Sequence, residues 1–174
     1  MTENARAENV IRAAKPDEAV SLSELALRSK GYWGYDEQFL VACRAELTLT
    51  SADLAAYPFY VLETKGRIAG FYSLREASAL DDAGSEVELN HLYIEPLAIG
   101  EGFGKRLWQH ACETARRLGF ERMAIPADPF AESFYLRMGA VRVGEIASGS
   151  IPGRMLPLLH FSLVQPPSAY ASDG

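Results

Sequence analysis

The segment that constrains the fold most lies in the middle of the chain, where a strand pattern, a glycine-rich turn and a helix pattern follow one another. Polar and apolar residues alternate through residues 86–94, which predicts a strand with two unlike faces. Three glycines stand within residues 100–104, and apolar residues then recur at helical spacing up to Leu118. A glycine-rich turn that opens a helix presents free backbone N–H groups at the positive helix end. The segment therefore predicts an anion-binding turn.

Two common phosphate-binding loops do not fit this turn. A Walker loop needs a glycine five positions before Gly104 and a Ser or Thr after Lys105, where the chain has Ile99 and Arg106. A dinucleotide fingerprint needs its third glycine at the place of Lys105, and the preceding order of elements is not that of a Rossmann unit. A turn that binds no ligand remains the alternative.

The other segments place this unit in an α/β domain. Further strands are expected at residues 10–13, 59–63, 68–74, 122–126, 141–147 and 155–164. Helices are expected from Pro16 to just before Gly31, after Asp36, in a short turn after Thr50 and over residues 131–138. This order predicts a mixed central sheet of about six to seven strands with helices on both faces.

Length and composition predict one domain in the cytoplasm. The 174 residues fit a single domain over residues 1–164, and the Pro-, Ser- and Ala-rich residues 165–174 are expected to form a flexible C-terminal tail. The polar N-terminus is unlike a secretory signal, and no apolar run approaches the roughly 20 residues of a membrane span. The net charge of −6 disfavours nucleic acid and anionic membrane surfaces as partners. Cys43 and Cys112 lack metal-ligand spacing, so no metal is expected.

Two motifs carry a resemblance to a known family. Residues 92–96, followed by Gly100-x-Gly102-x-Gly104-Lys105-x-Leu107, resemble the cofactor-binding motif of the GNAT superfamily of N-acetyltransferases. Residues 128–140 resemble the second motif of that family, and one helix and one strand separate the two motifs, as in the family. The resemblance covers residues 10–164 and implies a GNAT-like fold, with acetyl-coenzyme A as the acetyl donor.

The resemblance also implies a set of cofactor-binding residues. They are Leu92, Tyr93, Ile94, Ile99, Gly100, Glu101, Gly102, Phe103, Gly104, Lys105, Asp128, Ala131 and Phe134. The chain departs from the family at two of these positions. Ile99 stands where Gln or Arg is usual, and Asp128 stands where Asn is usual, so it lacks the amide donor. Neither departure affects the glycines.

Acetyl transfer to an amine needs a base, an oxyanion site and an acid. A free amine is mostly protonated at neutral pH, so a base must remove its proton before attack. Fixed N–H donors then stabilise the oxyanion, and an acid meets the departing thiolate. The resemblance implies that the donors come from residues 92–94 and that Tyr135 meets the thiolate. The alternative for Tyr135 is a half-buried core tyrosine whose hydroxyl bonds to a carbonyl.

Two residues of the strand at 86–94 are candidates for the base. Glu88 stands eleven residues before Ile99, the spacing of the glutamate in family members that use one, although a solvated strand face explains it nearly as well. His91 is the second candidate, because its unperturbed pKa suits a base near neutral pH. Strict alternation puts His91 on the apolar face with Val87, opposite Glu88, which favours a core or interface role. A β-bulge at residues 91–93, usual in this family, would reverse that placement.

The acceptor is expected to be a primary amine of a small molecule. Tyr32, Trp33 and Tyr35 form an aromatic cluster in a loop that in the family commonly walls the acceptor pocket, and His91 is grouped with them. These aromatics are equally well explained as core anchors of the loop. Three alternatives stay open: transfer of a different acyl group, a protein lysine or N-terminal acceptor, and a non-catalytic coenzyme A-binding sensor. A homodimer is also left open.

Overall fold

The computed structural model describes residues 9–77 and 85–164, so the tail expected at 165–174 lies outside the described residues. Seven strands form one sheet in the order β1-β2-β3-β4-β5-β7-β6. β4 and β5 are parallel, and every other neighbouring pair is antiparallel. The expected mixed sheet is confirmed. None of the helices in the described ranges is long and apolar enough to cross a membrane.

The bounds of the elements lie close to those expected from the sequence. The strands are β1 Val10–Ala13, β2 Phe59–Thr64, β3 Arg67–Glu76, β4 Glu86–Ile94, β5 Arg122–Pro126, β6 Val141–Ala147 and β7 Met155–Ser162. The helices are α1 Ala19–Gly31, α2 Glu37–Leu47, α3 Ser51–Ala56, α4 Phe103–Arg117 and α5 Glu132–Arg137, with short 3-10 helices at Pro16–Glu18 and Pro96–Ala98.

Local signals in the sequence explain several of these bounds. The Asp36 side chain accepts a hydrogen bond from the Phe39 N–H at 2.8 Å and caps α2. The segment Thr50–Asp53 forms the expected capping box at the start of α3. Lys65 and Gly66 both have positive φ, as a two-residue hairpin between β2 and β3 requires.

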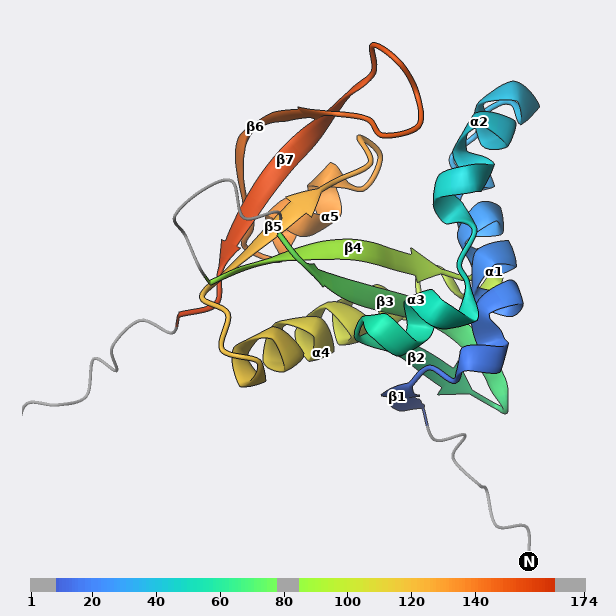
Figure 1. Ribbon diagram of the computed structural model, residues 1–174, viewed down its shortest axis with the longest axis horizontal. Helices are drawn as coiled ribbons and strands as arrows, with labels where there is room; N and C mark the ends of the chain where they lie inside the picture. The colour runs from blue at the N-terminus through green and yellow to red at the C-terminus, as the bar shows by residue number, and fades with distance from the viewer. Residues whose placement is uncertain (1–8, 78–84, 165–174) are drawn as a thin grey trace, which may run out of the picture.

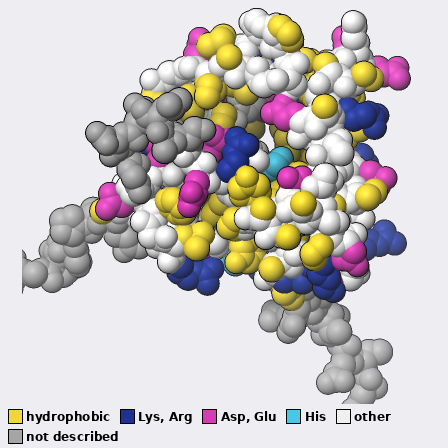
Figure 2. Space-filling view, viewed as in Figure 1, with side chains coloured by type: hydrophobic (Ala, Val, Ile, Leu, Met, Phe, Trp, Pro, Cys, Tyr) yellow, Lys and Arg dark blue, Asp and Glu magenta, His cyan; other side chains and the backbone are white. Residues whose placement is uncertain are grey.

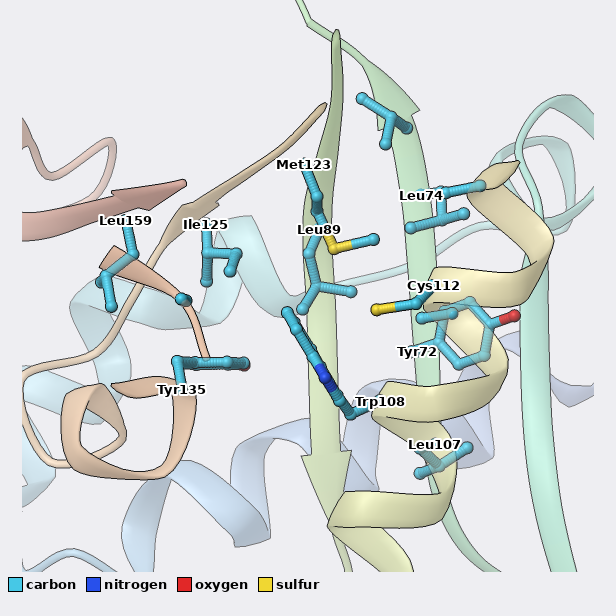
Figure 3. Packing of buried hydrophobic residues seen from close by; sticks show 14 of the residues in the cluster. Tyr72, Leu74, Leu89, Leu107, Trp108, Cys112, Met123, Ile125, Tyr135 and Leu159 are labelled. Atoms are coloured by element: carbon cyan, nitrogen blue, oxygen red, sulfur yellow. The ribbon is translucent and has the colours of Figure 1, made fainter. Parts of the chain in front are cut away.

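Two apolar clusters cover the two faces of the sheet (Figure 1). One joins α4 and α5 to side chains such as Tyr72, Leu89 and Ile125, and Figure 3 shows how these pack around Trp108. The other joins α1, α2 and α3 to side chains that include Phe71. The helices therefore lie on both faces, as the sequence predicts.

The register of β4 corrects the expected pattern of its faces. Ser73 of β3 pairs with His91, whereas the next residue of β3 pairs with Leu89, so Asn90 has no counterpart on β3. This bulge reverses the alternation that precedes it. Leu92 therefore packs with the α4 cluster and Tyr93 with the α1–α3 cluster, the reverse of the strict alternation. His91 consequently lies on the same face as Glu88.

β4 and β5 diverge after a short parallel contact. Their pairing spans residues 86–88 of β4 and 122–124 of β5, and no pair between them is recorded beyond Glu88 in the described chain. Figure 1 shows β5, β6 and β7 turning away from β1–β4 on this side. The edge of β4 at residues 89–94 that faces β5 is therefore open, with backbone groups free to bond a ligand.

Gly70 of β3 allows α4 to approach the sheet closely. A Cβ at this position would lie 2.8 Å from the Tyr93 carbonyl oxygen, 2.8 Å from the Ile94 side chain and 3.0 Å from Leu107 of α4. Only a residue without a side chain fits between these groups. The close approach sets the position of α4, and with it the turn at its N-terminus.

Candidate active site

The glycine-rich turn joins β4 to α4 with several backbone donors unused. Gly100 and Gly102 have φ values of 93° and 83°, which glycine adopts without strain. The first hydrogen bond of α4 runs from the Arg106 N–H to the Gly102 carbonyl at 3.2 Å, so the N–H groups of residues 103–105 have no helical acceptor. A Cβ on Gly100 or Gly102 would meet nothing within 4 Å, which leaves the turn open to a ligand. Free donors at the positive end of a helix fit a pyrophosphate.

Residues of α5 lie close to this turn. A Cβ on Gly104 would lie 3.5 Å from the Phe134 ring and 4.0 Å from the Ile94 side chain. The Tyr135 ring centre lies 5.7 Å from that of Trp108 in α4. Figure 3 shows Tyr135 pointing from α5 toward Trp108, across the space where β4 and β5 diverge. The two predicted motifs therefore meet at one end of β4.

The Tyr135 hydroxyl is protonated at neutral pH and has no hydrogen-bond partner among the described residues. Only 5% of Tyr135 is exposed, and this burial, with the nearby Asp128 charge, raises the pKa of the phenol above its usual range. Glu132 Oε2 is the one fully buried side-chain polar atom without a hydrogen-bond partner in the described ranges, so the Tyr135 hydroxyl is not completely enclosed. The expected alternative, a hydroxyl bonded to a carbonyl, is not observed.

Glu88 lies on the polar face of β4 beside an arginine. Its Oε1 accepts a hydrogen bond from Arg75 Nη2 of β3 at 2.9 Å, and 20% of its side chain is exposed. Glu86, two residues earlier on the same face, pairs with Arg122 of β5 and lies 3.9 Å from His160 of β7. Both carboxylates of this face are thus held by arginines from neighbouring strands.

His91 is buried between aromatic rings. Its Nδ1 lies 2.6 Å from Ser73 Oγ, and its ring centre lies 5.8 Å from Phe59 and 5.9 Å from Phe71. Burial, assisted by the Arg75 charge, lowers the pKa of His91 to about 4. The ring is therefore neutral at physiological pH, as a hydrogen-bonded core histidine would be.

Asp128 joins three distant segments of the chain. Its carboxylate accepts hydrogen bonds from Lys30 Nζ at 2.8 Å, from the Tyr35 hydroxyl at 3.0 Å and from the Phe130 N–H at 2.9 Å. Arg154, beside the β6–β7 turn, lies 3.7 Å away. Burial alone raises the pKa of Asp128, but the hydrogen bond and charge of Lys30, together with the hydrogen bonds from the Phe130 N–H and Tyr35, lower the pKa overall. Asp128 is an ionised centre of this cluster.

The aromatic residues of the α1–α2 loop divide into two groups. Tyr35 packs inward, stacked on Phe39 with ring centres 4.0 Å apart. Trp33 and Tyr32 are 39% and 52% exposed, and Trp33 is parallel to the Phe130 ring at 5.7 Å. Figure 2 shows a hollow near the upper middle of the face in view, with acidic, basic and histidine side chains around it.

The comparisons with known proteins agree with this geometry. The model of the acetyltransferase (GNAT) family matches residues 21–140, more than half of the chain. The chain belongs to the GNAT family of acetyltransferases. The resemblance of the two sequence motifs to this family is confirmed, and the chain is an acyltransferase.

Relatives support the same assignment. A 5-NmdU N-acetyltransferase of Pseudomonas phage PaMx11 is 28% identical over 143 residues, which are 80% of this chain and 92% of the relative. The PaiA N-acetyltransferase of Thermoplasma acidophilum in complex with coenzyme A has a TM-score of 0.71 at 18% identity, covering 89% of this chain and 99% of that one. The putative acetyltransferase YncA of Salmonella typhimurium with acetyl-CoA has a TM-score of 0.65 at 21% identity, covering 95% and 98%. The likeness to the solved structures establishes the GNAT fold.

The structure brings together only part of the residues selected from the sequence of this GNAT protein. The glycine-rich turn, the end of β4, Phe134 and Tyr135 lie together, and Tyr35 meets Asp128. His91 lies in the core beside Phe59 and Phe71, with its ring centre 6.1 Å from that of Tyr93. Lys30 and Arg154 were not selected, because no local motif marks either cation. Among the described residues, no group of three or more His, Cys, Asp or Glu side chains could hold a metal ion.

Proposed function

We propose that this protein transfers the acetyl group of acetyl-coenzyme A to the primary amine of a small molecule. The observation that carries the proposal is the pairing of an open glycine turn with Tyr135, whose unpartnered hydroxyl lies where β4 and β5 diverge. The N–H groups of residues 103–105 hold the pyrophosphate, and the pantetheine arm runs along the open edge of β4 toward Tyr135. The coenzyme A complexes of the structural neighbours support this assignment.

The reaction is a direct transfer. The neutral amine attacks the thioester carbonyl, a new C–N bond forms, and N–H donors of residues 92–94 stabilise the oxyanion. The intermediate then collapses with loss of the C–S bond. Tyr135 donates its proton to the departing thiolate, a role that its raised pKa supports because the phenol holds its proton at neutral pH.

Glu88 is the proposed base. It lies on the sheet face that carries the acceptor side, and its carboxylate accepts the amine proton directly or through water. Arg75 orients the carboxylate through a single hydrogen bond at Oε1, which leaves Oε2 free for the proton. His91 is the weaker candidate, because its ring is only 8% exposed and lies between Phe59 and Phe71. Its Nδ1 is also already bonded to Ser73.

A small acceptor is favoured over an extended peptide. The β6–β7 turn reaches α2, where Ser150 bonds to the Glu46 carboxylate (Figure 1). Arg154 also bonds to Tyr35 across the same space. An extended chain needs a groove open at both ends, and these contacts close one side.

The test is an acceptor screen with acetyl-coenzyme A that measures release of the free thiol and identifies products by mass spectrometry. The panel contains small primary amines, 5-NmdU, which is the acceptor named for the phage relative, and lysine or N-terminal peptides. We expect acetylation of a small amine and none of the peptides. Acetylated peptides would favour a protein acceptor. Coenzyme A binding without turnover of any acceptor would favour the sensor.

A further inference from the structure

Arg154 is held rigidly between distant parts of the chain. Its Nη2 lies 2.7 Å from the Tyr35 hydroxyl, and its guanidinium carbon lies 4.8 Å from the Phe39 ring centre and 5.2 Å from that of Tyr35. The two rings are themselves stacked. A guanidinium supported in this way on aromatic rings loses little further freedom when it binds a ligand.

The contacts of Arg154 leave most of its donors unused. A guanidinium carries five N–H donors, and among the described residues a hydrogen bond is recorded only from Nη2. Its other nitrogens are not buried, because Glu132 Oε2 is the one fully buried polar side-chain atom without a partner in the ranges that the structure describes. With 18% of its side chain exposed, Arg154 offers these donors to accessible space.

The local charge around Arg154 is positive. Lys30 and Arg154 are two cations beside the single carboxylate of Asp128, and both cations are largely buried. The nearby Glu46 is exposed and bonded to Ser150, so water screens its charge. This positive cluster stands out in a chain whose net charge is −6.

The cluster lies beside the proposed reaction centre. The Asp128 carbonyl accepts a hydrogen bond from the Ala131 N–H at 2.8 Å, and the Ala131 carbonyl accepts one from the Tyr135 N–H at 3.4 Å, so Asp128 immediately precedes the helix that carries Tyr135. Tyr35 links the same cluster to the loop expected to wall the acceptor site.

We propose that Arg154, supported by Lys30, binds an anionic group of the amine acceptor, either a carboxylate or a phosphate. This inference rests on the proposed acetyl transfer and names its substrate class as primary amines that carry such a group. Arg presents paired N–H donors that match the oxygens of both groups. Asp128 holds the two cations in place, and its single negative charge neutralises only one of their two positive charges.

Binding without turnover is the first test, measured by calorimetry in the presence of coenzyme A. The probes are β-alanine and O-phosphoethanolamine, each compared with the amine that lacks its anionic group, β-alaninamide or ethanolamine. We expect wild type to bind at least one anionic probe on the order of tenfold more tightly than its counterpart. A preference for β-alanine would indicate a carboxylate site, and a preference for O-phosphoethanolamine would indicate a phosphate site.

Variants of Arg154 test whether this residue causes the tighter binding of the anionic probe. Arg154→Gln removes the charge and should abolish the preference, whereas Arg154→Lys keeps the charge without the paired donors and should retain part of it. Arg117→Gln, an exposed arginine at the far end of α4, is the matched control and should leave the preference unchanged. Melting temperatures of all three variants show whether each is folded.

Turnover is the second test. In Arg154→Gln we expect kcat/KM for the better acceptor with an anionic group to fall roughly 10- to 100-fold, with less than about threefold change for the counterpart that lacks this group. The inference would be overturned if wild type bound the acceptors with and without the anionic group equally. It would also be overturned if Arg154→Gln lowered kcat/KM equally for both, which would leave Arg154 as a positioning residue. Acetylation of amines without any anion preference would reject the inference alone. An Arg154-dependent anion preference in binding, with no acetylation of any acceptor, would reject the proposed function alone.

Discussion

The cofactor side and the acceptor side of the candidate site are assembled from the chain in different ways. The cofactor side is formed mainly by one continuous stretch, from β4 through the glycine turn into α4. The acceptor side depends on contacts such as Lys30 with Asp128 and Tyr35 with Arg154, which join residues 98 and 119 positions apart. A local conformation can be predicted from residue types and their spacing, whereas a contact between distant residues follows no such pattern. The conformation of the glycine turn could therefore be predicted from the sequence, and the contacts of Lys30 and Arg154 could not.

The largest effect is expected at Tyr135, where the two sides meet. Tyr135→Phe keeps the ring against Trp108 and removes only the hydroxyl. If this hydroxyl protonates the thiolate, kcat should fall on the order of a hundredfold or more, with little change in affinity for acetyl-coenzyme A. Steady-state kinetics with an amine acceptor measures both quantities. Turnover at the wild-type rate would leave Tyr135 as a core residue.

The pH dependence of stability tests whether His91 is a buried core residue or part of the acceptor side. Its pKa of about 4 lies below the ordinary 6.5, so the unfolded state binds the proton more readily. The stability that His91 contributes is therefore complete above pH 6.5 and is lost as the pH falls toward 4. Wild type should lose about 2 kcal/mol of unfolding free energy from this group between pH 7 and pH 4.5.

Denaturant titrations of wild type and His91→Gln at the two pH values measure this contribution. The variant should be less stable than wild type at pH 7 and should show the smaller decline toward pH 4.5. An equal decline in both proteins would mean that His91 does not titrate as a buried residue, and would return it to the list of candidate bases.

A smaller effect is expected at Glu88. A base that accepts the amine proton makes the rate rise with pH until base and amine are both deprotonated. Glu88→Gln keeps the size but cannot accept the proton, so the rate should fall roughly tenfold below neutral pH and recover partly at high pH, where the amine is already free. Glu86→Gln is the matched control, because Glu86 lies on the same face and is also held by an arginine. If Glu88 only attracts the acceptor, KM rises instead and kcat is preserved.

The sequence predicts most of the fold because its signals are local. The strands at Arg122–Pro126 and Val141–Ala147 have the expected bounds, and the caps at Asp36 and Thr50 begin their helices as expected. A bulge was raised as a possibility at residues 91–93 only from the family resemblance, and the structure has it at Asn90, where it arises from the pairing of β4 with Ser73 of β3. That single unpaired residue decides which side chains of β4 lie on each face of the sheet.

The site shows the same division. The motif that contains Asp128 marked its position, but the family pattern suggested a cofactor contact there, and the partners of its carboxylate lie in α1 and beside the β6–β7 turn. No spacing in the sequence relates Lys30 or Arg154 to Asp128. Their meeting depends on how α1 and the β6–β7 turn pack around β5, which only the tertiary structure determines.

The glycine turn is expected to bind acetyl-coenzyme A, and a thermal-shift measurement detects this binding. Gly102→Val places a branched side chain at a φ of 83° beside the free donors, and Gly119→Val imposes a similar strain at a φ of 91° at the other end of α4. A ligand that binds only the folded state stabilises it by about 2.7 kcal/mol at a concentration 100 times Kd.

Both glycine variants should melt below wild type in the absence of ligand. On addition of acetyl-coenzyme A, wild type and Gly119→Val should show equal increases in melting temperature, and Gly102→Val should show none. An undiminished increase in Gly102→Val would contradict the account and place the cofactor elsewhere.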